Sequence, residues 1–236
     1  MVKKYRNEWK YRCSSSDLAM IGNRLAAILE RDANSAANGK YEIHSLYFDD
    51  LHNTCMQEND AGISRRSKYR IRYYGSKPDF LRLERKEKRD SRCHKESCLL
   101  SLEDYDKIIH GNADELFWQT QDPLLRRFCM LILAKGFAPK AIIDYERTAY
   151  IEEISNVRIT LDENISVSDD LVHFLDGNYL RYPLQENSEH VLEVKFDDIL
   201  PSHVRHVITN RDLVQSSFSK YYLGRKKLQN MGRVLL

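Results

Sequence analysis

The sequence predicts an α+β fold in which an antiparallel β-barrel encloses a charged lumen and is covered on its outside by helices. Strand-like segments outnumber helical ones, and both short turns and helical excursions connect them. Most of the strands carry charged residues on one face and apolar residues on the other. Such faces are compatible with a closed barrel if the apolar faces point outward and lie under helices.

The composition indicates a soluble cytoplasmic protein with one domain over residues 1–236. A hydrophobic content of 42% suffices for a core, and no repeat or Pro/Gly-rich linker divides the chain. Five cysteines without a CxxC pair favour a reducing compartment. The N-terminus lacks the apolar core of a signal peptide, and the longest apolar run, residues 128–134, is too short for a transmembrane segment. A net charge of +2 argues against a nucleic-acid-binding polycation.

Period-two alternation of polar and apolar residues predicts the strands. They are expected at residues 5–11, 41–50, 67–75, 140–150, 157–165 and 190–198, with a further strand in 81–90. In the fifth of these, Arg158, Thr160 and Asp162 share one face.

Helical spacing and capping signals predict helices at residues 14–32, 101–109, 122–136, 201–208 and 217–232. The helix at 101–109 opens with the S-x-x-D pattern of a capping box. In the helix at 122–136, Asp122 is the expected N-cap, Pro123 occupies the first helical position and Gly136 marks the end.

The charged strand faces repeat a small set of patterns. Paired residues two positions apart are Glu8 and Lys10, Arg70 and Arg72, Glu84 and Lys86, Tyr145 and Arg147, and Glu193 and Lys195. Any one of these faces is more typical of a solvated surface. Together they favour a barrel interior. Because each buried, unpaired cation costs several kcal/mol, such an interior predicts a bound polyanion, with the glutamates holding a divalent metal. That is the chemistry of a triphosphate.

The same residues resemble a known family, the catalytic domain of the vacuolar transporter chaperone (VTC) polyphosphate polymerases, within the triphosphate tunnel metalloenzymes (CYTH-like superfamily). The resemblance covers about residues 4–226. Its motifs appear in order as RNEWKY, SLYFDD, YRIRYYG, LERKEKRD, HKES, YERTAY, VRITLD, LEVK and FSKYYLG.

The resemblance implies transfer of the γ-phosphate of ATP onto a growing inorganic polyphosphate chain. The implied catalytic residues are Arg70, Arg72, Lys86, Arg147 and Lys220. Further phosphate contacts are implied for Lys10, Lys95, Tyr145, Arg158, Lys195 and Ser219. Glu193 would be the ligand of Mn2+ or Mg2+, and Glu8, Glu84 and Asp162 would complete the lining of the lumen.

Two positions depart from the pattern. The superfamily opens with E-x-E-x-K, but Arg6 replaces the first glutamate, and Ser217 replaces a residue that is commonly basic. A hydrolase of tripolyphosphate or nucleoside triphosphates, and a non-catalytic polyphosphate sensor, therefore stay as alternatives. Family members with transmembrane segments pass the product across a membrane. Here a membrane-protein partner could supply that step.

Overall fold

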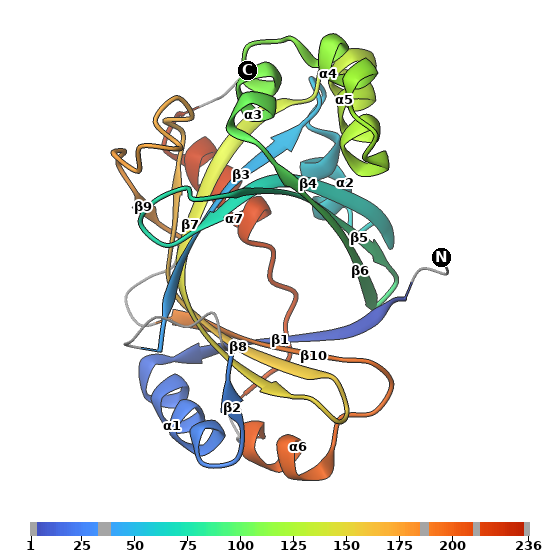
Figure 1. Ribbon diagram of the computed structural model, residues 1–236. Helices are drawn as coiled ribbons and strands as arrows, with labels where there is room; N and C mark the ends of the chain where they lie inside the picture. The colour runs from blue at the N-terminus through green and yellow to red at the C-terminus, as the bar shows by residue number, and fades with distance from the viewer. Residues whose placement is uncertain (1–3, 33–38, 185–188, 210–212, 234–236) are drawn as a thin grey trace.

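The computed structural model describes residues 4–32, 39–184, 189–209 and 213–233, and within these ranges it contains ten strands and seven helices (Figure 1). The strands are β1 (Arg6–Ser14), β2 (Glu30–Arg31), β3 (Tyr41–Asp49), β4 (Arg65–Tyr74), β5 (Leu81–Arg89), β6 (Arg92–Leu100), β7 (Ala138–Glu152), β8 (Val157–Ser168), β9 (Tyr182–Pro183) and β10 (Glu189–Phe196). The helices are α1 (Ser15–Ala26), α2 (Thr54–Asp60), α3 (Leu102–Ile109), α4 (Ala113–Gln119), α5 (Pro123–Lys135), α6 (Ser202–Ile208) and α7 (Lys220–Asn230).

Eight of the strands form a closed ring. Their order is β7-β3-β4-β5-β6-β1-β10-β8, every neighbouring pair is antiparallel, and pairing of β7 with β8 closes the circle. The narrowest seam joins β1 to β6 through only two residue pairs, Arg6 with Cys93 and Asn7 with Arg92. In Figure 1, β4–β6 arch over β1, β8 and β10, and β7 connects the two halves. The predicted antiparallel barrel is confirmed.

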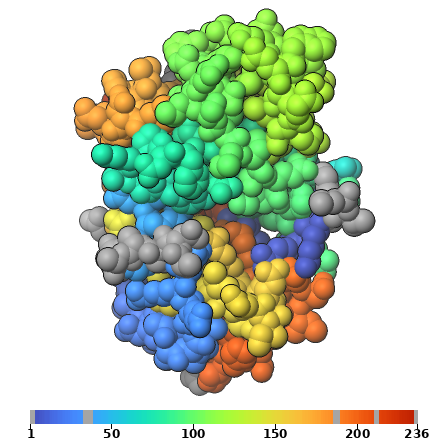
Figure 2. Space-filling view, viewed as in Figure 1, coloured from blue at the N-terminus to red at the C-terminus, as the bar shows by residue number. Residues whose placement is uncertain are grey.

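The apolar core forms two clusters, and most of it lies outside the ring. The larger cluster packs the outer faces of β3, β4, β5 and β7 against helices that include α3, α4 and α5. The smaller packs β1, β8 and β10 against α1 and α6, with Ile21 and Val204 fully buried. Figure 2 shows one face of the molecule, on which the surfaces of α3 and α5 lie above, and those of α1 and α6 below, the middle of the ring. Most residues of both clusters lie on the outward faces of the strands, so the charged faces point inward. On the inner face, Tyr47 and Ile143 of the larger cluster pack against α7, where Tyr47 stacks on Tyr221 and Ile143 lies beside Gly224.

Local signals hold the helices where the sequence predicts them. Ser14 and Asp17 form a capping box at the start of α1, with the Ser14 hydroxyl accepting from the Asp17 amide at 3.1 Å. In α5, Asp122 accepts from two amides of the first turn, and Gly136 ends the helix with a φ of 61°. These caps fix the helices that cover the ring.

Several elements differ from the sequence-based expectations. The helix predicted over residues 14–32 ends at Ala26, because Glu30 and Arg31 pair with β7 as β2. The helix predicted from residue 217 begins at Lys220. The full strand β6 and the seven-residue helices α2 and α4 were not predicted. Within the described ranges, no helix has the length and apolar character needed to cross a membrane.

Candidate functional site: a polar cluster inside the ring

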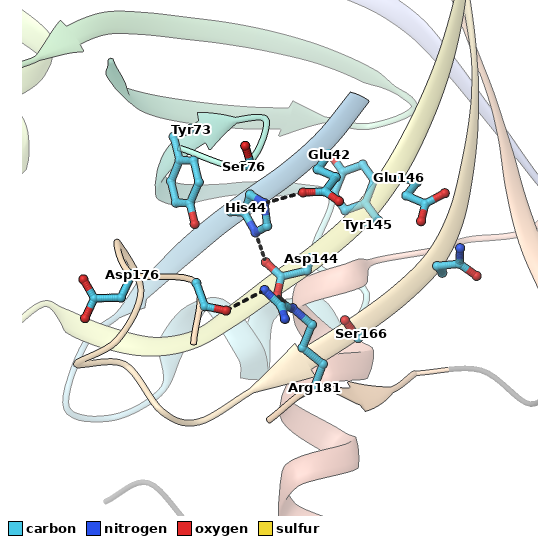
Figure 3. Close-up of a pocket in the computed structure, with 12 residues that line it drawn as sticks. Glu42, His44, Tyr73, Ser76, Asp144, Tyr145, Glu146, Ser166, Asp176 and Arg181 are labelled. Atoms are coloured by element: carbon cyan, nitrogen blue, oxygen red, sulfur yellow. Dashed lines mark hydrogen bonds and ion pairs between the residues drawn. The ribbon is translucent and has the colours of Figure 1, made fainter. Parts of the chain in front are cut away.

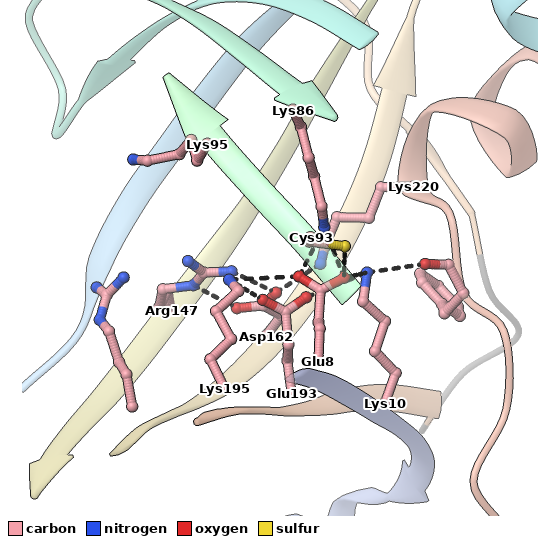
Figure 4. A network of polar contacts seen from close by, with 12 residues as sticks. Glu8, Lys10, Lys86, Cys93, Lys95, Arg147, Asp162, Glu193, Lys195 and Lys220 are labelled. Carbon is pink, nitrogen blue, oxygen red and sulfur yellow. Dashed lines mark hydrogen bonds and ion pairs between the residues drawn. The ribbon is translucent and has the colours of Figure 1, made fainter. Parts of the chain in front are cut away.

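Two glutamates and three lysines meet at the centre of the ring (Figure 4). Strand alternation places Glu8 and Lys10 on the inward face of β1, and Glu193 and Lys195 on that of β10. The register sets Glu8 opposite Lys195 and Lys10 opposite Glu193. Lys86 reaches this group from β5, with its Nζ 2.6 Å from both carboxylate oxygens of Glu8.

Glu193 lies between two of these lysines. The Lys10 Nζ is 3.1 Å from Oε2, and the Lys195 Nζ contacts Oε1. The Glu193 side chain is only 5% exposed, and burial alone would raise its pKa. The ammonium groups of Lys195 and Lys10 outweigh burial and hold the pKa well below its usual range. Glu193 is therefore an ionised carboxylate in the interior of the protein.

A second centre joins β7, β8 and the start of α7. Arg147 forms a bidentate pair with Asp162, and the Lys220 Nζ is 2.5 Å from the same carboxylate. The Asp162 side chain is fully buried. Burial raises its pKa, but Arg147 and Lys220 lower it more, to about 2. The three side chains are thus a buried, fully charged triad.

Tyr145 connects this triad to the arginines of β4. The Lys220 Nζ lies 4.6 Å from the centre of the Tyr145 ring, and the Arg72 Nη2 donates to the tyrosine hydroxyl at 2.8 Å. Burial raises the pKa of Tyr145, whereas Arg147 and Arg72 lower it, to about 8 overall. The phenol is a better hydrogen-bond donor to an anion than an ordinary tyrosine.

The third centre is Glu84 of β5, which gathers three cations from the two neighbouring strands β4 and β6. Arg70 donates to Glu84 Oε2 through Nε at 2.8 Å and Nη2 at 2.6 Å. The Lys95 Nζ is 3.0 Å from Oε1, and Arg72 Nη1 is 3.8 Å from Oε2. Arg70 also donates to the Tyr47 hydroxyl at 2.7 Å. The interior cations therefore outnumber the carboxylates that hold them.

Two predicted contacts lie at the edges of this cluster. Arg158 bonds Asp32 at 2.8 Å and the Tyr41 hydroxyl at 2.9 Å. Ser219 is the N-cap of α7, where its hydroxyl accepts from the Tyr222 amide at 3.3 Å. This cap places the positive N-terminal end of α7 beside the interior cations, which favours anions.

The two departures from the family pattern have simple structural accounts. Arg6 extends to Asp197, just after β10, with its Nε 3.0 Å from Oδ1. It therefore ties strand ends together instead of supplying a carboxylate. Ser217 is exposed, ahead of α7.

One interior residue was missed by the sequence-based assignment of roles. Lys68 lies on the inward face of β4 with Arg70 and Arg72, and its Nζ donates to Ser219 Oγ at 2.6 Å and Asn59 Oδ1 at 2.7 Å. Period-two alternation places Lys68 on the same face as Arg70 and Arg72. It was given no role because the family motif for this strand, YRIRYYG, begins one residue later, at Tyr69. Burial, then repulsion by Arg66, lowers the Lys68 pKa to about 7.

A separate polar pocket of about 410 Å³ lies against the other face of β3 and β7 (Figure 3). Its centre is Asp144, which accepts from His44 Nδ1 at 2.9 Å, Arg181 Nε at 2.9 Å and the Tyr179 hydroxyl at 3.0 Å. The His44 ring stacks on Tyr73. Apart from Tyr145 at its edge, this pocket contains none of the predicted site residues.

The comparisons with known proteins agree with this geometry. The family model described as the VTC domain matches residues 5–229. The chain belongs to the VTC domain family. A comparison with curated proteins found no match.

Solved structures give the fold. The chain is similar to a putative adenylyl cyclase, HpAC1, from Hippeastrum, whose description names a dominant triphosphatase activity. The sequence identity is 15%, the TM-score is 0.55, and the match covers 98% of this chain and 97% of that one. A putative adenylate cyclase from Bacillus halodurans matches at 10% identity, with a TM-score of 0.47 over 100% of this chain and 94% of that one. The match to HpAC1 shows that the chain has the triphosphate tunnel fold expected from its motifs.

Proposed function

We propose that this VTC domain is a metal-dependent phosphotransferase that moves the γ-phosphate of ATP onto a growing inorganic polyphosphate chain. The observation that carries the proposal is the interior charge pattern. Five cations converge from β4, β5, β7 and α7, and each is held by a carboxylate or hydroxyl that a phosphate oxygen can replace. They are Arg70, Arg72, Lys86, Arg147 and Lys220. Because buried cations need partners, the carboxylates hold the site charged and folded until a polyanion binds.

Phosphoryl transfer needs positioning and charge neutralisation more than covalent help. The forked guanidinium groups of Arg70 and Arg72 are suited to grip two oxygens of one phosphate. Their i, i+2 spacing on β4 directs both to the same side. Tyr145, whose pKa is lowered to about 8, supplies a hydroxyl donor between Arg72 and Arg147.

On the other wall, Lys10, Lys195 and Lys220 are placed to stabilise charge that develops on the leaving diphosphate. Further phosphate contacts are proposed for Lys95, Arg158 and Ser219. The cations are held in place by the carboxylates of Glu8, Glu84 and Asp162. If the acceptor is the terminal phosphate of a polyphosphate chain, it is already anionic. No general base is then required.

The interior fits a divalent metal such as Mn2+ or Mg2+. Glu193 offers carboxylate oxygens, and the hydroxyl of Thr160, its register partner on β8, is buried with no hydrogen-bond partner among the described residues. Within the described ranges, no three His, Cys, Asp or Glu side chains form a ready-made metal site. The ion would therefore use Glu193, phosphate oxygens and water, as Mg2+ commonly does. When bound, it would neutralise phosphate charge and orient the reacting oxygens.

Purified protein incubated with ATP and Mn2+, with and without a short polyphosphate primer, tests the proposal. The expected result is a ladder of long chains on a gel, lost in Glu193→Gln. Free phosphate without chains would indicate a hydrolase instead. Polyphosphate binding without turnover would indicate a sensor.

A further inference from the structure

Like charges face one another on β4 and β5 toward the β5–β6 hairpin. Lys68 lies directly across from Lys86, and Arg66 directly across from Lys88. Lys86 is in turn opposite Lys95 on β6. Like charges directly opposite in an antiparallel pair destabilise it. Arg65 and Arg89 also face one another, but both are exposed, whereas the inward cations are partly buried and their repulsion is screened less by water. A function that requires cations on the inward face would explain why they are there.

The cations at this end lack the carboxylates found deeper in the ring. Among the residues that the structure describes, Lys68, Arg66 and Lys88 make no ion pair, whereas Lys86 pairs with Glu8 and Lys95 with Glu84. Lys68 donates only to the neutral oxygens of Asn59 and Ser219, and Arg66 donates to the carbonyl of Ile63. Glu58 of α2 attracts Arg66 electrostatically but forms no ion pair with it.

The electrostatics of the three residues agree with this geometry. Burial lowers the pKa of each, and repulsion by Arg66 lowers the pKa of Lys68 and of Lys88 further. The pKa of Arg66 itself is lowered by burial. A bound anion would relieve this repulsion.

We propose that Lys68, Arg66 and Lys88 form an outer phosphate track, which binds phosphates of an inorganic polyphosphate chain beyond the reacting triphosphate. Successive inward residues of β4 lie about 6.7 Å apart, so Arg70, Lys68 and Arg66 present cations at regular intervals along a linear polyanion. The track continues the phosphate site toward the β5–β6 hairpin. The polyphosphate chain therefore extends out of the ring at this end. The inference rests on the proposed function and adds a direction to it.

Inorganic polyphosphate fits the track better than a single-stranded nucleic acid. Proteins that bind single strands combine cations with aromatic rings on which bases stack. The inward residues of β4, β5 and β6 beside the track are Arg66, Lys68, Lys86, Lys88, Cys93 and Lys95, and none is aromatic. The Tyr221 ring of α7 lies 5.7 Å from the Lys68 Nζ, but it is buried and already stacked on Tyr47, so no base can stack on it.

The test compares ligands of two lengths. Affinities for tripolyphosphate and for a medium-chain polyphosphate are measured by calorimetry over a range of salt concentrations, for the unmodified chain and the double variant Arg66→Gln/Lys88→Gln. The matched control is Arg65→Gln/Arg89→Gln, which removes the same charge from the adjacent cross-strand pair on the opposite face of the same two strands. Circular dichroism checks that both variants fold.

The expected result is that the Arg66/Lys88 variant lowers the ratio of long-chain to tripolyphosphate affinity about tenfold and reduces the salt slope for the long chain by about 1.4, as loss of two phosphate contacts does for single-stranded polyanions. The control should leave the ratio unchanged. An unchanged ratio in the test variant, an equal fall in the control, or equally tight binding of an oligonucleotide to the track would overturn the inference. Failure of the unmodified chain to bind either phosphate ligand would overturn the proposed function as well.

Discussion

Arg147 and Asp162 face one another across β7 and β8 as a buried bidentate pair, with Nε to Oδ1 at 2.6 Å and Nη2 to Oδ2 at 2.8 Å. Lys220 adds a second cation to the same carboxylate. One acidic side chain therefore holds two cations from distant parts of the chain inside the ring. In the absence of a ligand, Asp162 is therefore the counter-charge on which the stability of these two buried cations depends.

Asp162→Asn should lower the free energy of unfolding of the ligand-free protein by about 3–5 kcal/mol, because it leaves two buried cations without a counter-charge. Urea denaturation measures this. Tripolyphosphate should raise the stability of the variant more than that of the wild type, since it replaces the missing charge. Asp169→Asn, which breaks the exposed pair with Arg233, is the control and should cost at most about 1 kcal/mol. Equal stabilities for the two variants would contradict the prediction.

Lys86→Met should reduce turnover about 100-fold with little loss of stability. The lysine side chain is 32% exposed, and Glu8 keeps Lys10 and Lys195 nearby at 3.7 and 3.6 Å. Removing one preorganised charged donor typically costs two to three orders of magnitude in rate, or about 100-fold at the low end. Turnover and thermal unfolding are compared with those of Lys227→Met on the exposed part of α7. A large fall in melting temperature with unchanged turnover would assign Lys86 a structural role only.

Tyr145→Phe should weaken the pH dependence of phosphate binding. The pKa of Tyr145 is lowered to about 8 by Arg147 and Arg72 against the effect of burial. The tyrosinate that forms above that pH repels a bound phosphate, so affinity for tripolyphosphate should fall as pH rises through about 8. Lys220 also faces the ring and stays in place in the variant. Titrations across this range should show the fall in the wild type and a smaller one in the variant; parallel profiles would rule the tyrosine out.

Lys68→Met should stabilise the ligand-free protein in a pH-dependent way. The folded pKa of Lys68 is about 7, below the usual lysine value of about 10.4 in the unfolded chain. Between these values the unfolded state binds more protons, so wild-type stability rises with pH relative to the variant. The advantage of Lys68→Met is therefore largest below about pH 7 and disappears toward about pH 10. Urea denaturation across this window checks the sign, and a constant difference would refute it.

Strand alternation predicted much of the interior. The face containing Arg158, Thr160 and Asp162 points inward, and so does the face containing Glu193 and Lys195. The prediction succeeded because successive side chains of a strand point to opposite faces. Once helices cover the apolar face, the charged face must point into the ring.

The pairing of those charges could not be predicted. Lys86 bonds Glu8, which lies 78 positions earlier in the chain, because the ring brings β5 and β1 close together. Strand β6 was missed because its first six residues, 92–97, are mostly polar on both faces. Its outward residue Glu96 pairs with Arg85 and Arg127, so no amphipathic alternation marks the strand.

The most direct measurement is the affinity of tripolyphosphate for Arg72→Gln, with Arg65→Gln as the control. Arg72 is 3% exposed and faces the interior, whereas Arg65 is exposed on the same strand. If the ring interior is the phosphate site, Arg72→Gln should weaken binding about 30-fold, the loss of about 2 kcal/mol expected for a charged hydrogen-bond donor. The control should bind as tightly as the wild type. Equal affinities for all three proteins would contradict a phosphate site inside the ring.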